Sequence, residues 1–455
     1  MNNDIECYMA NSYCFRENGW TFLHIEGAPY ERGFQHGYHL AKDISKVFKN
    51  LAAITFLNTG KEIEYFIEAA HTLFSPSIDS EFIEELRGIA DGVSAAGCKI
   101  SFDALVVMNG YIELIYYWWP SVKDSRISWV KDKTEHCSAF IAAGDATKDN
   151  EIVMGHNTWW DFFLAQYFYV ILDIIPTDGY RVMMQCIPGF IHSMSDFFIT
   201  GAGIMGTATT INGFNKYKEG GVPEFSRVRK AKQYGSTIDE WARIMEKENN
   251  GGIANSWLLG DINTKEIARF ELGLVYSSLD KLKNGFFTGF NEAEDPRIRN
   301  LECENTEYND IRGNGSRKVR WKQLMEMNYG KIDIENAEFM LEDHYDIYLG
   351  IYQPGNRTIC GHWDVDPFEF TGMTGNKPYN PGGAVDGKVV SSSYAKDFSF
   401  WARYGRSCCE PFYVDEFLKK HPQWEWQREF LLDRPTQPWT LVRGNKCTKS
   451  PGYKI

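Results

Sequence analysis

The sequence predicts an α+β protein in which helices cover antiparallel sheets. Apolar residues recur at helical spacing in the first quarter of the chain, and short β-rich runs separated by glycine and proline follow from residue 137 onward. Helical patterns return in blocks near residues 225 and 316 and do not alternate strictly with strands. This block order favours antiparallel sheets over a doubly wound parallel sheet.

The first 136 residues are expected to be mainly helical. Helices are predicted over residues 30–57, from Ser80 onward, and over 102–117. Ser80 lies just before an acidic and apolar run, as is typical of a helix N-terminus. Residues 120–135 are polar and charged without periodicity, so we expect an exposed segment that suits proteolytic processing.

Next, the sequence predicts a hairpin with strands over 137–143 and 151–156 and a turn over 144–150. The later predicted strands are 181–187, 197–200, 203–211, 256–261 and 266–272, and the later predicted helices are 225–234, 237–248, 316–327 and 334–343. The glycine spacing of residues 201–206 resembles a dinucleotide-binding loop. A strand and not a helix follows it, so no phosphate site is expected there.

Composition narrows the class of protein. The net charge of −13, from 61 acidic and 48 basic residues, disfavours nucleic acid as a partner. The start of the chain has no signal-peptide pattern, and the longest apolar stretches are too short for membrane insertion. The ten cysteines form no Cys-x-x-Cys pair, which fits a reducing compartment, so a cytoplasmic location is expected.

Cys137 is the candidate nucleophile because of its neighbours in the hairpin. It begins the first strand, and His156, Asn157 and Asp161 follow about twenty residues later, at the second strand. A cysteine nucleophile needs a base, an oxyanion site and groups that hold the substrate. One of the ten histidines is an alternative base for Cys137.

Several motifs resemble N-terminal-nucleophile (Ntn) hydrolases. The segment around Cys137 and residues 155–162 resembles two branches of these enzymes, the isopenicillin N acyltransferase-like group and the phospholipase B-like proteins. Motifs similar to the first branch are residues 27–37, 85–92, 343–344 and 359–362, and those similar to the second are residues 188–189, 195–198 and 382–389. The resemblance extends from about residue 25 to about residue 412.

The resemblance implies a four-layer αββα sandwich of two antiparallel sheets and self-cleavage between His136 and Cys137. Residues 1–136 would form a helical α chain that stays associated with a catalytic β chain of residues 137–455. Cleavage gives Cys137 a free α-amino group. Since such an amine titrates near pH 8 and a thiol near 8.5, the amine can accept the thiol proton.

The same resemblance suggests roles for residues near the nucleophile. Asn255 is the candidate oxyanion donor, with a turn-capping asparagine as the alternative. Asp161 would hold the α-amino group or the substrate, with a solvated acid as the alternative. His156 stands where many amide-hydrolysing relatives carry arginine, and the phospholipase B-like branch accepts histidine there. Asn157 and Thr158 are expected to be local hydrogen bonders or substrate contacts.

Further substrate contacts are expected from four residues. Trp160 lies in the polar and indole-rich cluster that follows the second predicted strand, and Ser316, Arg317 and Arg320 lie at the start of a predicted helix. Ser316 is also expected to cap that helix. The acyltransferase-like branch keeps a serine and an arginine near the substrate in this region, and spacing does not distinguish the two arginines.

One group of polar residues offers the ligands of a candidate metal site. Asp343, His344, Cys360, His362 and Asp364 together offer metal ligands. The gap of sixteen residues between His344 and Cys360 fits no zinc pattern, and polar pairing at a helix end explains the group equally well. No metal and no cofactor are therefore expected.

The predicted function is that of a self-processing cysteine hydrolase. It would hydrolyse a small-molecule linear amide, or transfer its acyl group, through a Cys137 thioester. One alternative is a phospholipase B-like carboxylic-ester hydrolase that uses the same groups on lipid acyl chains. The other is an unprocessed scaffold that binds a ligand. A homo-oligomer is compatible with the sequence.

Overall fold

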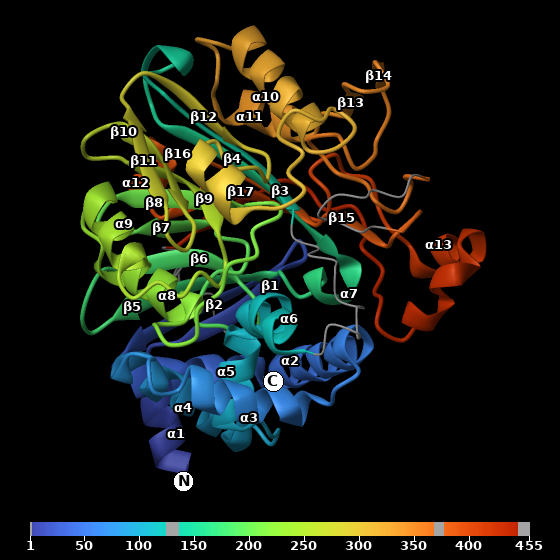
Figure 1. The fold of residues 1–455 in the computed structure, drawn as a ribbon. Coiled ribbons are helices and arrows are strands. Elements are labelled where there is room, and N and C mark those ends of the chain that lie inside the picture. Colours follow the sequence, from blue (N-terminus) through green and yellow to red (C-terminus); the bar gives the residue numbers. More distant parts are fainter. Residues whose placement is uncertain (1, 124–135, 368–376, 445–455) are drawn as a thin grey trace.

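The computed structural model describes residues 2–123, 136–367 and 377–444 and has a mixed α+β architecture built on two large sheets (Figure 1). The predicted α+β class is confirmed. The segment over residues 124–135, where processing is expected, lies outside the described residues.

The larger sheet has nine strands, and its neighbours are antiparallel except for one parallel pair. Its order is β1 (Tyr13–Glu17), β2 (Trp20–Gly27), β5 (Val170–Pro176), β6 (Val182–Cys186), β7 (Phe198–Thr200), β8 (Ile204–Thr210), β9 (Asn255–Asp261), β10 (Glu266–Leu272) and β11 (Ser277–Leu282). The sequence did not predict β1, β2 or β5. Short apolar runs such as β2 cannot be assigned by periodicity, and pairing with β5 decides their conformation.

The second sheet contains the predicted hairpin. Its order is β12 (Gly285–Gly289), β3 (His136–Ala143), β4 (Val153–Asp161), β16 (Asp386–Ser391), β17 (Ser399–Tyr404) and β18 (Thr440–Arg443), and β15 (Gly382–Ala384) also pairs with β4. The β3–β4 hairpin is confirmed, although β4 runs on to Asp161. A small ribbon joins β13 (Tyr345–Asp346) to β14 (Ile351–Tyr352).

Most predicted helices are present. The helices are α1 (Asn2–Met9), α2 (Pro29–Thr59), α3 (Ile63–Leu73), α4 (Ser80–Ala95), α5 (Phe102–Asn109), α6 (Trp119–Val122), α7 (Phe162–Ala165), α8 (Glu224–Tyr234), α9 (Ile238–Glu246), α10 (Gly315–Met327), α11 (Ile334–Leu341), α12 (Ser392–Lys396) and α13 (Val414–Lys420). The helix predicted over 102–117 is divided into α5 and a π-helical turn, Glu113–Trp118. No helix of the described residues combines the length and apolarity needed to cross a membrane.

The two sheets pack face to face through a shared apolar core. Ile171 and Met183 of the larger sheet meet Ile141 and Met154 of the smaller one in this core. Helices α2 to α5 pack in a second cluster with the larger sheet, and α10 and α11 in a third with the smaller sheet. Figure 1 shows the blue helices and the orange helices on opposite sides of the molecule.

Four glycines allow α2 and α4 to cross closely. A Cβ atom at Gly33 or Gly37 would lie 2.0 or 2.1 Å from a carbonyl oxygen of α4, and one at Gly88 or Gly92 would lie 2.2 Å from a carbonyl oxygen of α2. The glycines at positions 33, 37, 88 and 92 are thus explained by close backbone contact between α2 and α4.

Candidate active site

Cys137 lies between the two sheets. In the β3–β4 ladder it pairs with Thr158, and Ala139 pairs with His156. Paired residues point to the same face, and residues two apart along a strand share that face. Since Ala139 belongs to the core between the sheets, the Cys137 side chain points to this inner side, where 9% of the residue is exposed.

The backbone N–H and the backbone carbonyl of Cys137 each have a side-chain partner. Its N–H donates to Oδ1 of Asn291 at 2.9 Å, and its carbonyl oxygen accepts a hydrogen bond from Nη1 of Arg317 at 2.5 Å. Asn291 is itself fixed, because its Nδ2 donates to the carbonyl of Thr210 at 2.9 Å. The peptide nitrogen of Cys137 therefore has a defined and fixed side-chain partner.

Both terminal nitrogens of the Arg317 guanidinium form hydrogen bonds at the start of α10. Besides the Cys137 carbonyl, its guanidinium donates to Ser138 Oγ at 3.1 Å, Asn291 Oδ1 at 3.0 Å and Asn314 Oδ1 at 2.6 Å. It also lies 4.4 Å from the centre of the Trp159 ring. Burial lowers the pKa of Arg317 to about 10, so it remains a cation at neutral pH.

A buried polar cluster lies on the face of the sheet that carries the Cys137 side chain. Lys388 Nζ donates to Thr158 Oγ1 at 2.7 Å, Gln185 Oε1 at 2.6 Å and Asp386 Oδ1 at 2.5 Å. The other oxygen of Asp386 accepts from Gln185 Nε2 at 2.6 Å. An ammonium has three donors, so Lys388 is saturated and acts as a fixed charge.

These surroundings set the charge of the Cys137 thiol. Burial raises the pKa of the Cys137 thiol to about 12, and the backbone of Trp159 and the charge of Lys388 oppose this shift. Burial and Lys388 hold the pKa of His156 well below its ordinary value, so His156 is neutral. The Cys137 thiol is therefore protonated at neutral pH in this structure.

The structure brings Asn255 close to this network. Asn255 pairs with Thr210 across β8 and β9, and Thr210 accepts a hydrogen bond from the Asn291 side chain. Asn255 is 2% exposed, and its Oδ1 has no hydrogen-bond partner among the described residues. Asp161 ends β4, three residues beyond Thr158, and accepts a hydrogen bond from Asn380. Asn255 as oxyanion donor and Asp161 as amine holder stay predictions.

Two other predicted substrate contacts, Trp160 and Asn157, lie on opposite faces of β4. Trp160 is buried on the side of β4 that carries Thr158 and packs on Phe168. Asn157 points to the opposite face, where its Nδ2 donates to the carbonyls of Leu341 and Ile359. Of Trp160 and Asn157, only Trp160 therefore lies on the face of the sheet that carries the Cys137 side chain.

The three predicted contact residues of α10 have different partners. Arg317 contacts Cys137, while Arg320 forms a two-pronged ion pair with Asp343 at 2.8 and 2.6 Å. The expected capping role of Ser316 is wrong, since Asn314 precedes the helix and Ser316 Oγ donates to the carbonyl of Arg357 at 3.2 Å. Its first-turn position turns the hydroxyl toward a neighbouring loop.

Sequence reasoning missed Asn291 and the cluster of Lys388, Asp386 and Gln185. Lys388 and Asp386 were inside the motif over residues 382–389, where a lysine placed before two valines in a β-rich run was the available signal. Asn291 lies 154 positions from Cys137, and no local pattern marks it.

Comparison with known proteins adds independent evidence. A family model described as Phospholipase B matches residues 7–276. The chain is 27% identical to phospholipase B of Crotalus adamanteus, over 88% of this chain and 82% of that protein. It is 23% identical to phospholipase B-like protein C of Dictyostelium discoideum, over 71% and 63%, and 26% identical to phospholipase B-like 1 of Homo sapiens, over 59% and 51%. The last two are covered over less than two thirds of their length.

Proposed function

The chain belongs to the phospholipase B family, and we propose on this premise that it hydrolyses carboxylic esters of lipid acyl chains with Cys137 as the nucleophile. The observation that supports this best is the position of Cys137. It lies near the head of β3, with its nitrogen on Asn291 and its carbonyl on Arg317, in a chain whose relatives include a phospholipase B. The family comparisons favour an ester over the linear amide predicted from sequence.

The proposed first event is self-cleavage. The Cys137 sulfur attacks the carbonyl carbon of His136, the C–N bond to Cys137 breaks, and the nitrogen takes a proton to become an amine. Water then hydrolyses the resulting thioester, which leaves a carboxylate on His136 and restores the thiol. Asn291, already hydrogen-bonded to this nitrogen, would hold the new amine beside the sulfur.

The new amine would then be the base for turnover. It takes the thiol proton as sulfur attacks the ester carbonyl, and it returns that proton to the alcohol as the C–O bond breaks. Water attacks the acyl thioester, the C–S bond breaks, and a carboxylic acid leaves. A donor at Asn255 would stabilise each oxyanion, and the loss of one such donor costs on the order of 100- to 1000-fold in rate.

We further assign the layers to the αββα arrangement of Ntn hydrolases. Two sheets packed face to face, with helices in separate clusters on each, support this assignment. The N-terminal segment supplies β1 and β2 to the nine-stranded sheet, and β2 pairs with β5 over seven residues. Because removal would open that sheet, we expect the two chains to stay associated after cleavage.

The test uses purified full-length protein. Intact mass should give two chains that meet at His136–Cys137, and the processed protein should release fatty acid from phosphatidylcholine. Cys137→Ala should stay uncut and inactive. Cys98→Ala, which removes a half-buried cysteine after α4, should process and act normally.

The assay also separates the alternatives. Hydrolysis of N-acyl amino acids without release of fatty acid from phosphatidylcholine would support the linear-amide hydrolase instead. A Cys137→Ala protein with full ester hydrolysis would overturn the proposed nucleophile, and an uncut wild type that binds lipid without hydrolysis would support a scaffold.

A further inference from the structure

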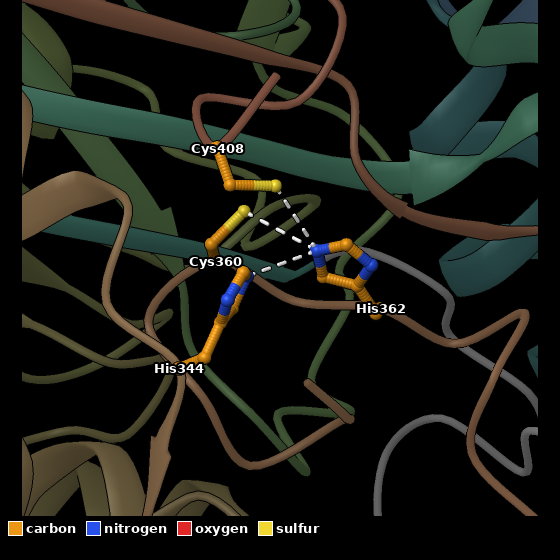
Figure 2. A group of neighbouring side chains, drawn as sticks. All are labelled: His344, Cys360, His362 and Cys408. Atoms are coloured by element: carbon orange, nitrogen blue, oxygen red, sulfur yellow. Dashed lines mark hydrogen bonds between the residues drawn. The ribbon is translucent and has the colours of Figure 1, made fainter. Parts of the chain in front are cut away.

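A second group of reactive side chains lies apart from Cys137. His344 follows α11, Cys360 and His362 flank Gly361, and Cys408 follows β17. Their ligand atoms all lie within 4.8 Å of one another, and Figure 2 shows the four side chains pointing toward one another. Cys360 and His362 are fully buried.

Hydrogen bonding alone does not account for this group. Nε2 of His362 lies 3.1 Å from Nε2 of His344, 3.6 Å from Sγ of Cys360 and 3.4 Å from Sγ of Cys408. A ring nitrogen offers either one N–H or one lone pair, so it cannot satisfy three such neighbours. Four donor atoms turned to a common point are instead the arrangement of a metal centre.

The three separations from Nε2 of His362 match one coordination geometry. Zinc in a tetrahedral site lies about 2.0–2.1 Å from histidine nitrogen and about 2.3 Å from cysteine sulfur. Tetrahedral angles then put two nitrogens about 3.3 Å apart and a nitrogen and a sulfur about 3.6 Å apart. The three measured separations, 3.1, 3.6 and 3.4 Å, agree with these values.

We propose that His344, Cys360, His362 and Cys408 bind one structural Zn²⁺ ion. A set of two histidines and two cysteines leaves no open position, which is the mark of a structural and not a catalytic zinc site. The expectation of no metal rested on the spacing of His344 and Cys360, and it omitted Cys408, which lies 46 positions beyond His362. Ligands from three separate loops need no regular spacing.

The two acids considered with this group belong elsewhere. Asp343 pairs with Arg320, and Asp364 pairs with Arg406 at 2.6 Å. These ion pairs fix the loops on either side of the ligands. The second ring nitrogen of His362 faces the Glu410 carboxylate at 3.6 Å, a direction in which zinc-bound histidines usually have a partner.

The site would brace the strand behind the nucleophile. Gly361 packs so closely on Trp159 that a Cβ atom would lie 2.6 Å from the indole, and Ala384 donates its N–H to the Gly361 carbonyl at 2.8 Å. Trp159 pairs with His136 in β3 and lies under the Arg317 guanidinium. A bound ion would therefore support the outer face of β4, opposite Cys137.

The experiment measures metal in the full-length protein, purified under reducing conditions without chelator. We expect about one zinc per chain in the wild type and below about 0.2 in Cys360→Ser and in His362→Asn. Cys409→Ser, which changes the cysteine next to Cys408, is the matched control and should keep its zinc.

Cobalt substitution tests the site in the wild type, so its result does not depend on whether a variant folds. Co²⁺ exchanged into the protein should give the intense visible bands of a tetrahedral ion and a thiolate charge-transfer band. The proposal is overturned if the wild type holds less than about 0.1 zinc and gives no such spectrum. It is also overturned if peptide mapping finds Cys360 and Cys408 joined by a disulfide in protein kept reduced, or if Cys360→Ser/Cys408→Ser retains a full zinc complement.

Discussion

Replacing Lys388 with methionine tests the buried charge beneath the nucleophile. The change removes the ammonium from Asp386, Thr158 and Gln185 but keeps most of the side-chain volume. Lys388 and Asp386 are both 0% exposed, so the variant leaves a carboxylate buried without its cation. Removing one partner of a buried ion pair typically costs about 3–5 kcal/mol, and we expect Lys388→Met to lose about 4 kcal/mol of unfolding free energy.

The assay is urea unfolding followed by tryptophan fluorescence in a Cys137→Ala background, where every protein stays one chain. The double variant Lys388→Met/Asp386→Asn is the control, because it removes both charges and should recover at least half of the loss. A single variant that loses less than about 1 kcal/mol, or a double variant no better than the single, would refute the buried-ion-pair reasoning.

The charge also bears on the thiol. Burial raises the pKa of Cys137 and Lys388 opposes it, so loss of the ammonium should raise that pKa further. With Cys137 restored, Lys388→Met should process more slowly at pH 7, with the pH profile moved to the alkaline side.

Arg317→Lys should slow self-processing about 100-fold, because an ammonium cannot reproduce the guanidinium contacts to four acceptors. Arg320→Lys is the control and should change the rate less than threefold. Intact-mass time courses measure both rates. Gly88→Ala should cost about 3 kcal/mol or more in urea unfolding, since its Cβ would lie 2.2 Å from a carbonyl oxygen of α2, and Gly60→Ala, which enters open space at φ +69°, should cost about 1 kcal/mol. Burial raises the pKa of Glu113 to about 7, so its contribution to stability is present below pH 4.5 and is lost as the pH rises through 7. Relative to Glu113→Gln, the wild type should therefore lose up to about 3 kcal/mol between pH 4.5 and 8, and parallel stability curves would contradict this.

Local signals predicted much of the fold. The helices over 30–57 and 316–327 and the β3–β4 hairpin follow from periodicity and turn residues, and Thr237 caps α9 by accepting from the Glu240 N–H. β2 was missed because its conformation depends on pairing with β5, about 150 positions away. A short apolar run has no local preference strong enough to decide between helix and strand.

The site divides in the same way. The sequence by itself determined that Cys137 lies at the start of one strand and His156 on its partner, because a hairpin is a local structure. The structure then showed that this partner strand continues through Thr158 and Trp160. Only the tertiary structure decided that Asn291 meets the Cys137 nitrogen, that Arg317 and not Arg320 reaches its carbonyl, and that Cys408 completes the cluster with His362. These contacts join loops and strands from distant parts of the chain, and only the packing of the two sheets and their helices determines which of those parts meet.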